Sequence, residues 1–560
     1  MAEIARRPVV SALLGLALSL ASLGAAPAPA QPDLRSIEEA LRAGRCREAA
    51  EGYVAFASKD RDPRSAQRAV EVALACRHLP AAWRAAQRLR ELDPENPDAL
   101  RLIGIVAMEL WKIDEARGIF ADLLAKPDVE FERALIEILP TLTEDDLAPA
   151  AWIVFRPLVP RDKASPRVLA ELARLACGAD DLSACGSLIR EARERGGGRD
   201  ARTVRLYAAT LSALGQPALA LGEAELVARG DPDNHRFARV ETLVALERAE
   251  EARSELLRIA AEVQAAGASE LLVEVDRRLA LLALNEGDLT EAERRLRRRL
   301  ASERGAAEAV FYLALISERR GEPAIAEQGY RQLIEAGAGL SPRIRLARML
   351  LARGDSAGAM ALFDELVRGG RADLVQLEIA RSRVLSEADR HAEAIAAIDA
   401  TLERHPDYPD LLYQRAVLLD SAGRTREAIK QLESLLAVRP DDGHVLNALG
   451  YTLADRQREL ARAERLIRTA LEQRPDNAAF IDSLAWVRFR RGDARGAEPL
   501  LARAWQLSRE PEIAAHWGEV LWALGERDRA REVWARGRRM APESMPLRET
   551  VERFLGESAL

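Results

Sequence analysis

The sequence predicts an all-α solenoid, a stack of about 15 helix–turn–helix repeats, some of them degenerate. Four copies of one unit lie between Pro409 and Pro542, and the clearest reads LLYQRAVLLDSAGRTREAIKQLESLLAVRP. A period of about 34 residues with two amphipathic helices per unit is typical of helical solenoids. At 560 residues the chain is also too long for one compact core, whereas a solenoid buries each repeat only against its neighbours.

A small residue early in the second helix of each unit explains the period. The first helix crosses there, and only a small side chain lets two helix backbones approach closely. Gly450 and Gly518 occupy the matching place in the first helix. Alanines recur at this position along the chain, although the surroundings of Ala150 and Ala184 support them poorly: Ala49, Ala82, Ala116, Ala150, Ala184, Ala220, Ala252, Ala292, Ala326, Ala359, Ala394, Ala428, Ala463, Ala497 and Ala530.

Prolines end the second helix in several units, because proline disfavours α conformation in the residue before it. Pro440, Pro475 and Pro542 stand at these ends. Together with the crossing alanines and glycines, this set of residues resembles the tetratricopeptide repeat. The resemblance implies that the first helix of each repeat lines a concave face, and that the chain binds proteins or peptides.

Residues 1–30 read as a secretion signal. Arg6 and Arg7 precede an apolar run from Val9 to Leu23, which is short for a bilayer span. Ala28-Pro29-Ala30 offers small-residue cleavage sites after Ala28 or Ala30, and we expect a mature chain from Gln31. An uncleaved membrane anchor is the alternative. No second apolar run is long enough to span a membrane, so we expect a periplasmic protein without a transmembrane segment in its mature chain.

Three further segments follow: a divergent arm at 31–200, the main superhelix at 201–542 and a capping helix at 543–560. Prolines between Pro140 and Ser165 predict irregular or broken helices, and a 40-residue gap before Ala292 predicts longer helices around Val263 to Val275. Leu547, Val551 and Phe554 would lie on one face of the last helix. A partner-docking helix is the alternative to a cap.

The four cysteines of a secreted chain suggest two disulfides. Cys46 and Cys76 lie near the turns of the first two repeats, and Cys177 and Cys185 bracket the turn of a degenerate one. We therefore favour the pairs 46–76 and 177–185. Four buried free thiols are the alternative.

No catalytic constellation, cofactor motif or metal-binding spacing is visible, so we expect no enzyme, cofactor or metal. An enzyme hidden in the degenerate region between Pro140 and Gly198 is a remote alternative. The net charge of −7 excludes a nucleic-acid footprint. The basic run Arg294–Arg299 is interpreted as a solvated helix face, since acidic residues alternate with such clusters.

A groove on the C-terminal repeats is the candidate site. Its aromatic and polar side chains suit an extended peptide, because apolar anchors give affinity while amides and carboxylates hold the backbone. The alternative is that the aromatics only fill space between repeats. The groove positions are Tyr413, Asn447, Tyr451, Asp482, Trp486, Phe489, Glu519 and Trp522.

Two segments resemble a narrower group of proteobacterial envelope proteins: the run that starts Asp62-Pro-Arg-Ser-Ala-Gln-Arg-Ala-Val-Glu-Val-Ala, and Ile481-Asp-Ser-Leu-Ala-Trp with the following 511–525. The group is similar to the lipoprotein partner of a periplasmic carboxyl-terminal processing protease. The resemblance implies an adaptor that brings a serine protease and its substrates together. The lipobox cysteine is missing, because Ala26 follows Leu23-Gly24-Ala25, so acylation is not expected. An assembly or chaperone factor for envelope proteins is the second hypothesis.

Overall fold

The computed structural model describes residues 34–43, 45–143, 147–198, 200–230, 235–300, 306–368, 374–403, 408–542 and 544–556. Within these ranges the chain forms 31 α-helices and no strand, which confirms the predicted all-α solenoid. The expected signal at 1–30 lies outside the described residues.

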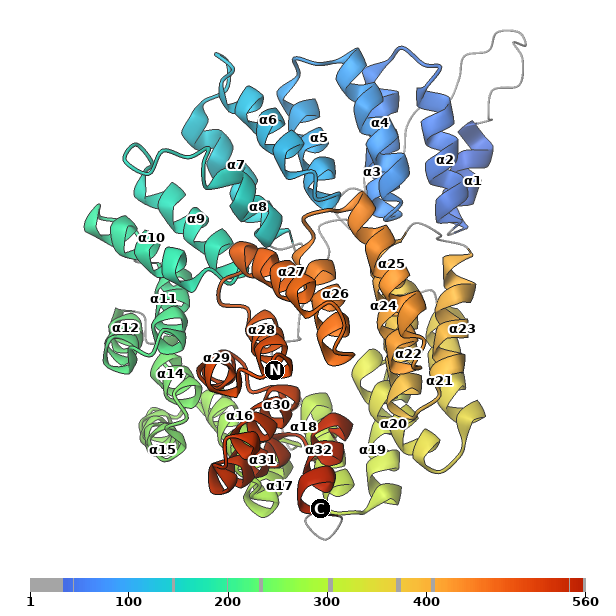
Figure 1. The fold of residues 1–560 in the computed structure, drawn as a ribbon. Helices are drawn as coiled ribbons and strands as arrows, with labels where there is room; N and C mark the ends of the chain where they lie inside the picture. The colour runs from blue at the N-terminus through green and yellow to red at the C-terminus, as the bar shows by residue number, and fades with distance from the viewer. Residues whose placement is uncertain are drawn as a thin grey trace.

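The first twelve helices form an arc that runs across the top and down the left of Figure 1. They pair in chain order as helix–turn–helix units. They are α1 (Leu34–Arg42), α2 (Cys46–Ala57), α3 (Pro63–Ala75), α4 (Leu79–Leu92), α5 (Pro97–Glu109), α6 (Ile113–Leu124), α7 (Phe131–Leu142), α8 (Ala148–Phe155), α9 (Pro166–Gly178), α10 (Leu182–Glu194), α11 (Ala201–Ala213) and α12 (Pro217–Gly230).

The middle helices continue the arc around the bottom and up the right of Figure 1. They are α14 (Ala238–Ala245), α15 (Ala249–Ala265), α16 (Ser269–Glu286), α17 (Leu289–Leu300), α18 (Ala306–Arg319), α19 (Pro323–Glu335), α20 (Leu340–Ala352), α21 (Ser356–Arg368), α22 (Leu374–Glu387) and α23 (His391–Leu402).

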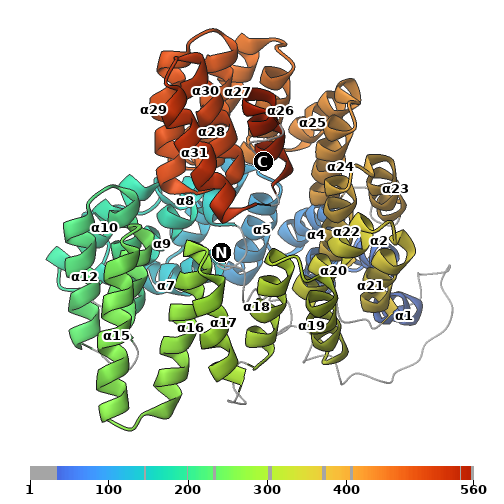
Figure 2. The same cartoon turned by 90° about the horizontal axis from the view of Figure 1, so that it is seen from below.

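The last helices turn inward and form a second layer on the arc, over α5, α8 and α9 (Figure 2). They are α24 (Pro409–Ser421), α25 (Thr425–Val438), α26 (Gly443–Asp455), α27 (Leu460–Gln473), α28 (Ala478–Arg490), α29 (Ala494–Leu507), α30 (Pro511–Ala523), α31 (Arg527–Met540) and α32 (Met545–Leu555).

The residues at the helix crossings are tightly packed. All the crossing alanines except Ala184 are at most 1% exposed. A Cβ added to Gly518 would overlap the indole of Trp534, so the two helices of that repeat meet without room for a methyl group. Ala184 is only half-buried, and Cys185 is the fully buried residue instead. The prediction was one residue off there: Cys185, which is joined to Cys177 by a disulfide, takes the buried position of α10.

Short polar side chains begin many of the first helices. At such an N-cap the side-chain oxygen accepts from a backbone N–H that the helix leaves unpaired. Pro commonly follows, because its fixed φ suits the first helical position. These N-caps are Asp62, Asn96, Ser165, Asp200, Asp442 and Asn477.

The two irregular regions take the form that the sequence suggests. α7 continues through Pro140 to Leu142, α8 has only 8 residues, and residues 156–165 form no α-helix. α15 and α16, with 17 and 18 residues, are the longest of the described helices. The apolar core that starts at Ile37 continues to Ala220, so it runs past the expected boundary at residue 200 without a break.

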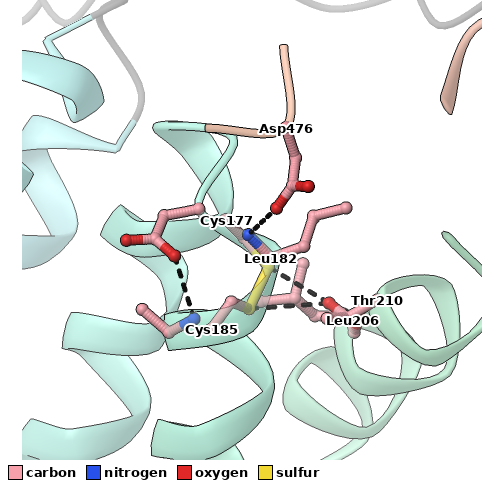
Figure 3. Close-up of a disulfide and its surroundings, with 8 residues drawn as sticks. Cys177, Leu182, Cys185, Leu206, Thr210 and Asp476 are labelled. Atoms are coloured by element: carbon pink, nitrogen blue, oxygen red, sulfur yellow. Dashed lines mark hydrogen bonds between the residues drawn. A yellow bond between two sulfur atoms is a disulfide. The ribbon is translucent and has the colours of Figure 1, made fainter. Parts of the chain in front are cut away.

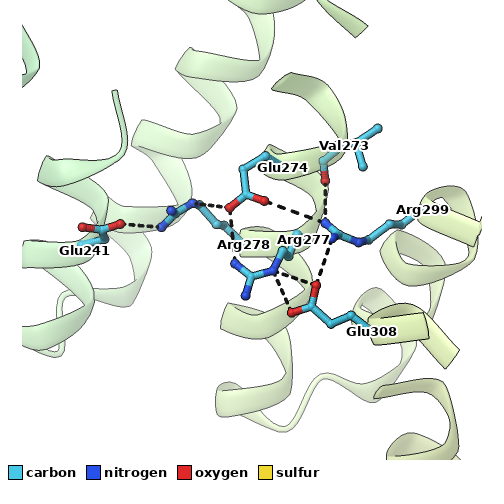
Figure 4. Close-up of polar contacts among 7 residues, drawn as sticks. All are labelled: Glu241, Val273, Glu274, Arg277, Arg278, Arg299 and Glu308. Carbon is cyan, nitrogen blue, oxygen red and sulfur yellow. Dashed lines mark hydrogen bonds and ion pairs between the residues drawn. The ribbon is translucent and has the colours of Figure 1, made fainter. Parts of the chain in front are cut away.

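The basic run of α17 is only partly a solvated face. Arg295 lies 2.7 Å from the Asp276 carboxylate of α16, and Arg299 is 8% exposed. Arg299 bonds Glu308 of α18 at 2.9 Å, and Arg277 bonds the same carboxylate (Figure 4). These arginines therefore join three successive helices. The expectation that they only face solvent was wrong.

The two layers meet along one line, which we call the seam. At the seam the turns that follow α3, α5, α9 and α14 contact the C-terminal repeats. Glu109 of the first layer accepts from Arg439 through its backbone carbonyl at 2.6 Å, across 330 residues of sequence. Ala213 accepts from Arg503 in the same way at 3.1 Å, across 290 residues. One superhelical turn therefore takes about 290–330 residues.

In most of the described repeats, a turn residue with positive φ lies two positions after the first helix. Several repeats have glycine there with φ near +80°, for example Gly354 and Gly525. Five repeats of the arc have a larger residue in this left-handed conformation, which costs a non-glycine residue about 1–3 kcal/mol: Arg77, Trp111, Asp180, Glu247 and Asp389. The first four of these lie at the seam.

Candidate protein-binding surfaces

The first helices α24, α26, α28 and α30 lie side by side on the inner face of the C-terminal repeats and form the C-terminal groove. Six predicted residues are partly exposed on it: Tyr413, Asn447, Tyr451, Phe489, Glu519 and Trp522. Trp486 and Asp482 are 4% and 6% exposed, so they lie beneath the surface of the groove. Their side chains are covered by the neighbouring helix α30.

His516 of α30, which the sequence analysis missed, covers both residues. Its Nδ1 lies 2.9 Å from the Asp482 carboxylate, and its ring stacks on Trp486 with 4.2 Å between centroids. Trp486 in turn donates its indole N–H to Asp455 at 3.3 Å. His516 stands 34 residues after Asp482, one repeat period, so the spacing itself could have indicated the pair.

The electrostatics of this cluster favour a protonated imidazole. Burial of His516 opposes protonation, but the carboxylates of Asp482, Glu512 and Glu519 together outweigh it, so the pKa of His516 is raised above its usual value. Burial also raises the pKa of Tyr451 well above its usual value, and the carboxylates of Asp455 and Asp482 add to the effect. Tyr451 is therefore a neutral hydrogen-bond donor at the edge of the groove.

The end of the groove at α30 is occupied by α32. Trp522 lies 5.7 Å from Phe554 of α32, ring to ring, and Arg553 bonds Glu519 at 2.7 Å. Leu547 and Val551 of α32 are at most 1% exposed against α30 and α31. Trp522 and Glu519 therefore serve the packing of the last helix, and the accessible groove lies between α24 and α28.

Two adjoining cavities lie along the seam. The larger one, of ≈ 740 Å³, is bounded by α22, α24 and α26 on one side and by α5, α7 and α8 on the other, and we call it the seam cavity. Tyr413 is part of its lining. The second, of ≈ 700 Å³, lies between α9–α11 and α27–α30, and Arg474 borders both. Both volumes fall within the range of about 300–1,000 Å³ that ligand sites occupy.

A polar cluster at the turn between α9 and α10 joins the layers. Arg474 lies 2.7 Å from the Asp180 carboxylate, and Asn477 donates to the same carboxylate at 2.9 Å. The Asp476 carboxylate accepts from the backbone N–H of Leu182 at 3.0 Å (Figure 3). Further along the seam, Glu247 pairs with Arg509 and Arg536.

The Cys177–Cys185 disulfide spans the turn that carries Asp180 (Figure 3). The hydroxyl of Thr210 lies 3.2 Å and 3.5 Å from the two sulfur atoms, so α11 packs directly on the bond. The expected Cys46–Cys76 disulfide is not formed: the two side chains are in contact, but no bond joins them. Contact with Cys46, together with burial, raises the pKa of the Cys76 thiol.

Among the described residues, no group of three or more His, Cys, Asp or Glu side chains is placed to hold a metal ion. Within the same ranges, no helix combines the length and the apolar character that a membrane span needs. The arrangement of the described residues offers grooves and cavities for binding.

Comparisons with known proteins support tetratricopeptide repeats in this chain. Two segments, residues 277–341 and 385–450, match tetratricopeptide-repeat families. The TPR repeat-containing protein PA4667 of Pseudomonas aeruginosa is 33% identical over 210 residues, which cover 37% of this chain and 35% of that protein. The match thus spans about a third of the length of this relative.

Two solved structures are similar over different lengths. TTC0263, a TPR protein of Thermus thermophilus, is 24% identical, covers 33% of this chain and 97% of its own, and gives a TM-score of 0.29. Yeast Tom70 is 16% identical over 83% of this chain and 96% of its own, with a TM-score of 0.36.

Proposed function

We propose that the protein is a scaffold that holds more than one protein partner. The observation that carries this proposal is the presence of two kinds of binding surface on one superhelix. The C-terminal groove presents partly exposed aromatic side chains on α24, α26 and α28, whereas the two seam cavities lie between the layers, and Tyr413 borders both surfaces. Tetratricopeptide repeats typically bind proteins or peptides. Partners held on the two surfaces would meet at a raised effective concentration.

The specific form we propose is a periplasmic adaptor for a carboxyl-terminal processing protease and its substrates. Its support is the resemblance of the segments 62–73, 481–486 and 511–525 to such an adaptor, together with the secretion signal expected at 1–30. In this role the chain binds and the partner protease performs the chemistry. The C-terminal groove would hold one partner and the seam the other.

Site-specific photocrosslinking tests the proposal. A photoreactive amino acid in place of partly exposed Phe489 should capture partner proteins from an envelope extract. The matched control replaces Val438, which is 62% exposed and belongs to α25, outside the first helices that form the groove. Equal capture from both positions, or capture from neither, would contradict a groove scaffold. A serine protease among the products supports the adaptor, whereas outer-membrane or assembly proteins alone would favour an assembly factor.

A further inference from the structure

The seam cavity is built from the first helices of three successive repeats. The cavity is lined by Ile379 and Arg383, which lie one helical turn apart on α22. Tyr413 and Gln414 of α24 also line it. Residues that lie three, four or seven positions apart share one face of a helix. The first layer closes the opposite side with Met108 and Trp111, so the cavity exists only because the superhelix closes on itself.

Gln414 is a largely buried side chain whose amide faces the seam cavity. It is 5% exposed, lines the cavity and forms no hydrogen bond with any described residue. Its amide oxygen and nitrogen keep access to solvent through the cavity. A ligand that offers both a donor and an acceptor would take the place of water there, since the amide carries both functions.

Arg383 supplies an unmatched positive charge. The cavity lining holds four arginines and three carboxylates. Arg383 forms no ion pair and no hydrogen bond among the described residues. The other three arginines are paired: Arg77 with Glu109 at 3.1 Å, Arg439 with Asp442 at 3.2 Å and Arg474 with Asp180 at 2.7 Å. A guanidinium is well suited to bind a carboxylate, because its planar N–H groups match the two oxygens.

Tyr413 adds a neutral donor next to these groups. Its hydroxyl also forms no hydrogen bond among the described residues. Burial and the Asp442 carboxylate raise the pKa of Tyr413, so the phenol keeps its proton at neutral pH. The cavity thus combines a phenol O–H, a carboxamide and a guanidinium on adjoining helices.

We propose that the seam cavity binds an extended, acidic segment of a partner protein, with a carboxylate at Arg383 and a peptide group at Gln414. This inference rests on the proposed scaffold function, since it names the chemistry of one partner. A segment in this place contacts both layers, so binding also holds the superhelix closed. Binding weakens as salt rises, because the interaction depends on charge.

Fluorescence anisotropy with a labelled peptide of alternating Glu and Ser tests the inference, and a peptide of alternating Lys and Ser is the matched probe. The acidic peptide should bind the full-length protein and the basic peptide should not. Arg383→Gln should weaken binding about tenfold or more, because a charge-assisted hydrogen bond is lost. Arg465→Gln, which removes the same charge from an exposed site on α27 outside the cavity, should leave binding unchanged.

Gln414→Leu separates binding from folding. The leucine has a similar size but no amide, so the variant should melt close to the natural protein while it binds the acidic peptide several-fold more weakly. The inference is overturned if the acidic peptide does not bind, if the basic peptide binds equally well, or if the Arg383→Gln and Gln414→Leu proteins bind like the natural one. Capture by the photoreactive group at position 489 is independent of these results, so a failure here with capture retained would overturn the seam site and leave partner binding at the groove intact.

Discussion

The charge of His516 depends on the side chains that surround it in the C-terminal groove. Its ring touches Asp482 and Trp486, and the carboxylates of Glu512 and Glu519 face it from its own helix. Tyr451 approaches it from α26, with 6.0 Å between ring centroids. The imidazolium therefore sits among acidic and aromatic groups that stabilise it, and its protonation links the packing of α26, α28 and α30.

We predict that His516 makes stability depend on pH. Its pKa in the folded protein is raised above the unfolded value of 6.5, so its contribution is fully present below pH 6.5 and is lost as pH rises through the raised pKa. The melting temperature of the natural protein should therefore fall towards that of His516→Gln as pH increases over this range. His391→Gln, a change on α23 away from the groove, is the control and should keep the natural pH profile. Parallel profiles for all three proteins would contradict the prediction.

Gly518 is a position where one methyl group decides stability. A Cβ there would overlap Trp534, which is 1% exposed and donates its indole N–H to Ala515, so the ring has no free space to move into. Gly518→Ala should cost about 1–3 kcal/mol in urea unfolding.

Gly118 of α6 is the matched control for this change. A Cβ at Gly118 would meet nothing within 4 Å, so Gly118→Ala should be neutral or stabilise by up to about 1 kcal/mol through helix propensity. Equal effects of the two substitutions would show that crossing geometry is not the cause.

At the level of single elements, the turn between α9 and α10 matters most for how the two layers are joined. The disulfide closes a loop of 8 residues around Asp180, whose carboxylate and carbonyl both bond the second layer. Cys177→Ala with Cys185→Ala should cost about 2 kcal/mol, as expected for a short closed loop. Thiol titration of the denatured, unreduced natural protein should find two thiols, from Cys46 and Cys76. Four thiols would contradict the 177–185 bond, and none would indicate a second disulfide.

The elements were largely predictable and the site was only partly so. Crossing alanines fix where two helices of one repeat meet, and this depends on residues within one period, as at Ala497 and Gly518. Trp486 could not be assigned in the same way. Whether an inward residue of a first helix is open or covered depends on the next repeat, and there His516 covers it. Gln414 and Arg383 escaped notice because neither is unusual in an amphipathic helix.

The whole molecule is defined by the seam, which no local pattern predicts. The seam arises from the small rotation between successive repeats, summed over about 290–330 residues, so a slight change in each repeat would separate the layers. One sign was present in the sequence: the turn position that is glycine in several repeats holds Asp180 and Glu247 at the seam. Asp389 occupies the same position away from the seam, so such residues alone suggest only a less favourable turn.

Removing the charges at the seam should loosen the closed form. Each ion pair contributes only about 0.2–1 kcal/mol, so we combine Asp180→Asn with Glu247→Gln. We expect a larger radius of gyration in small-angle X-ray scattering than for the natural protein, and a smaller difference between them at high salt.

Asp389→Asn is the matched control for the seam variant. Asp389 has the same left-handed turn conformation, but its side chain is 86% exposed and lies away from the seam. Its scattering curve should superimpose on that of the natural protein. If the double variant superimposes as well, backbone contacts such as Arg439 to Glu109 hold the layers together without the charged turns.

The seam also changes how such a chain should come apart. An ordinary repeat array frays from its ends, because each unit depends only on its neighbours. Here the repeat that holds Asp180 contacts the repeat that holds Arg474, so neither repeat can unfold without disturbing the other. Contacts between such distant residues slow folding. They also make the array unfold as one cooperative unit. Denaturation should therefore follow a single sharp transition and not a gradual loss of repeats from the ends.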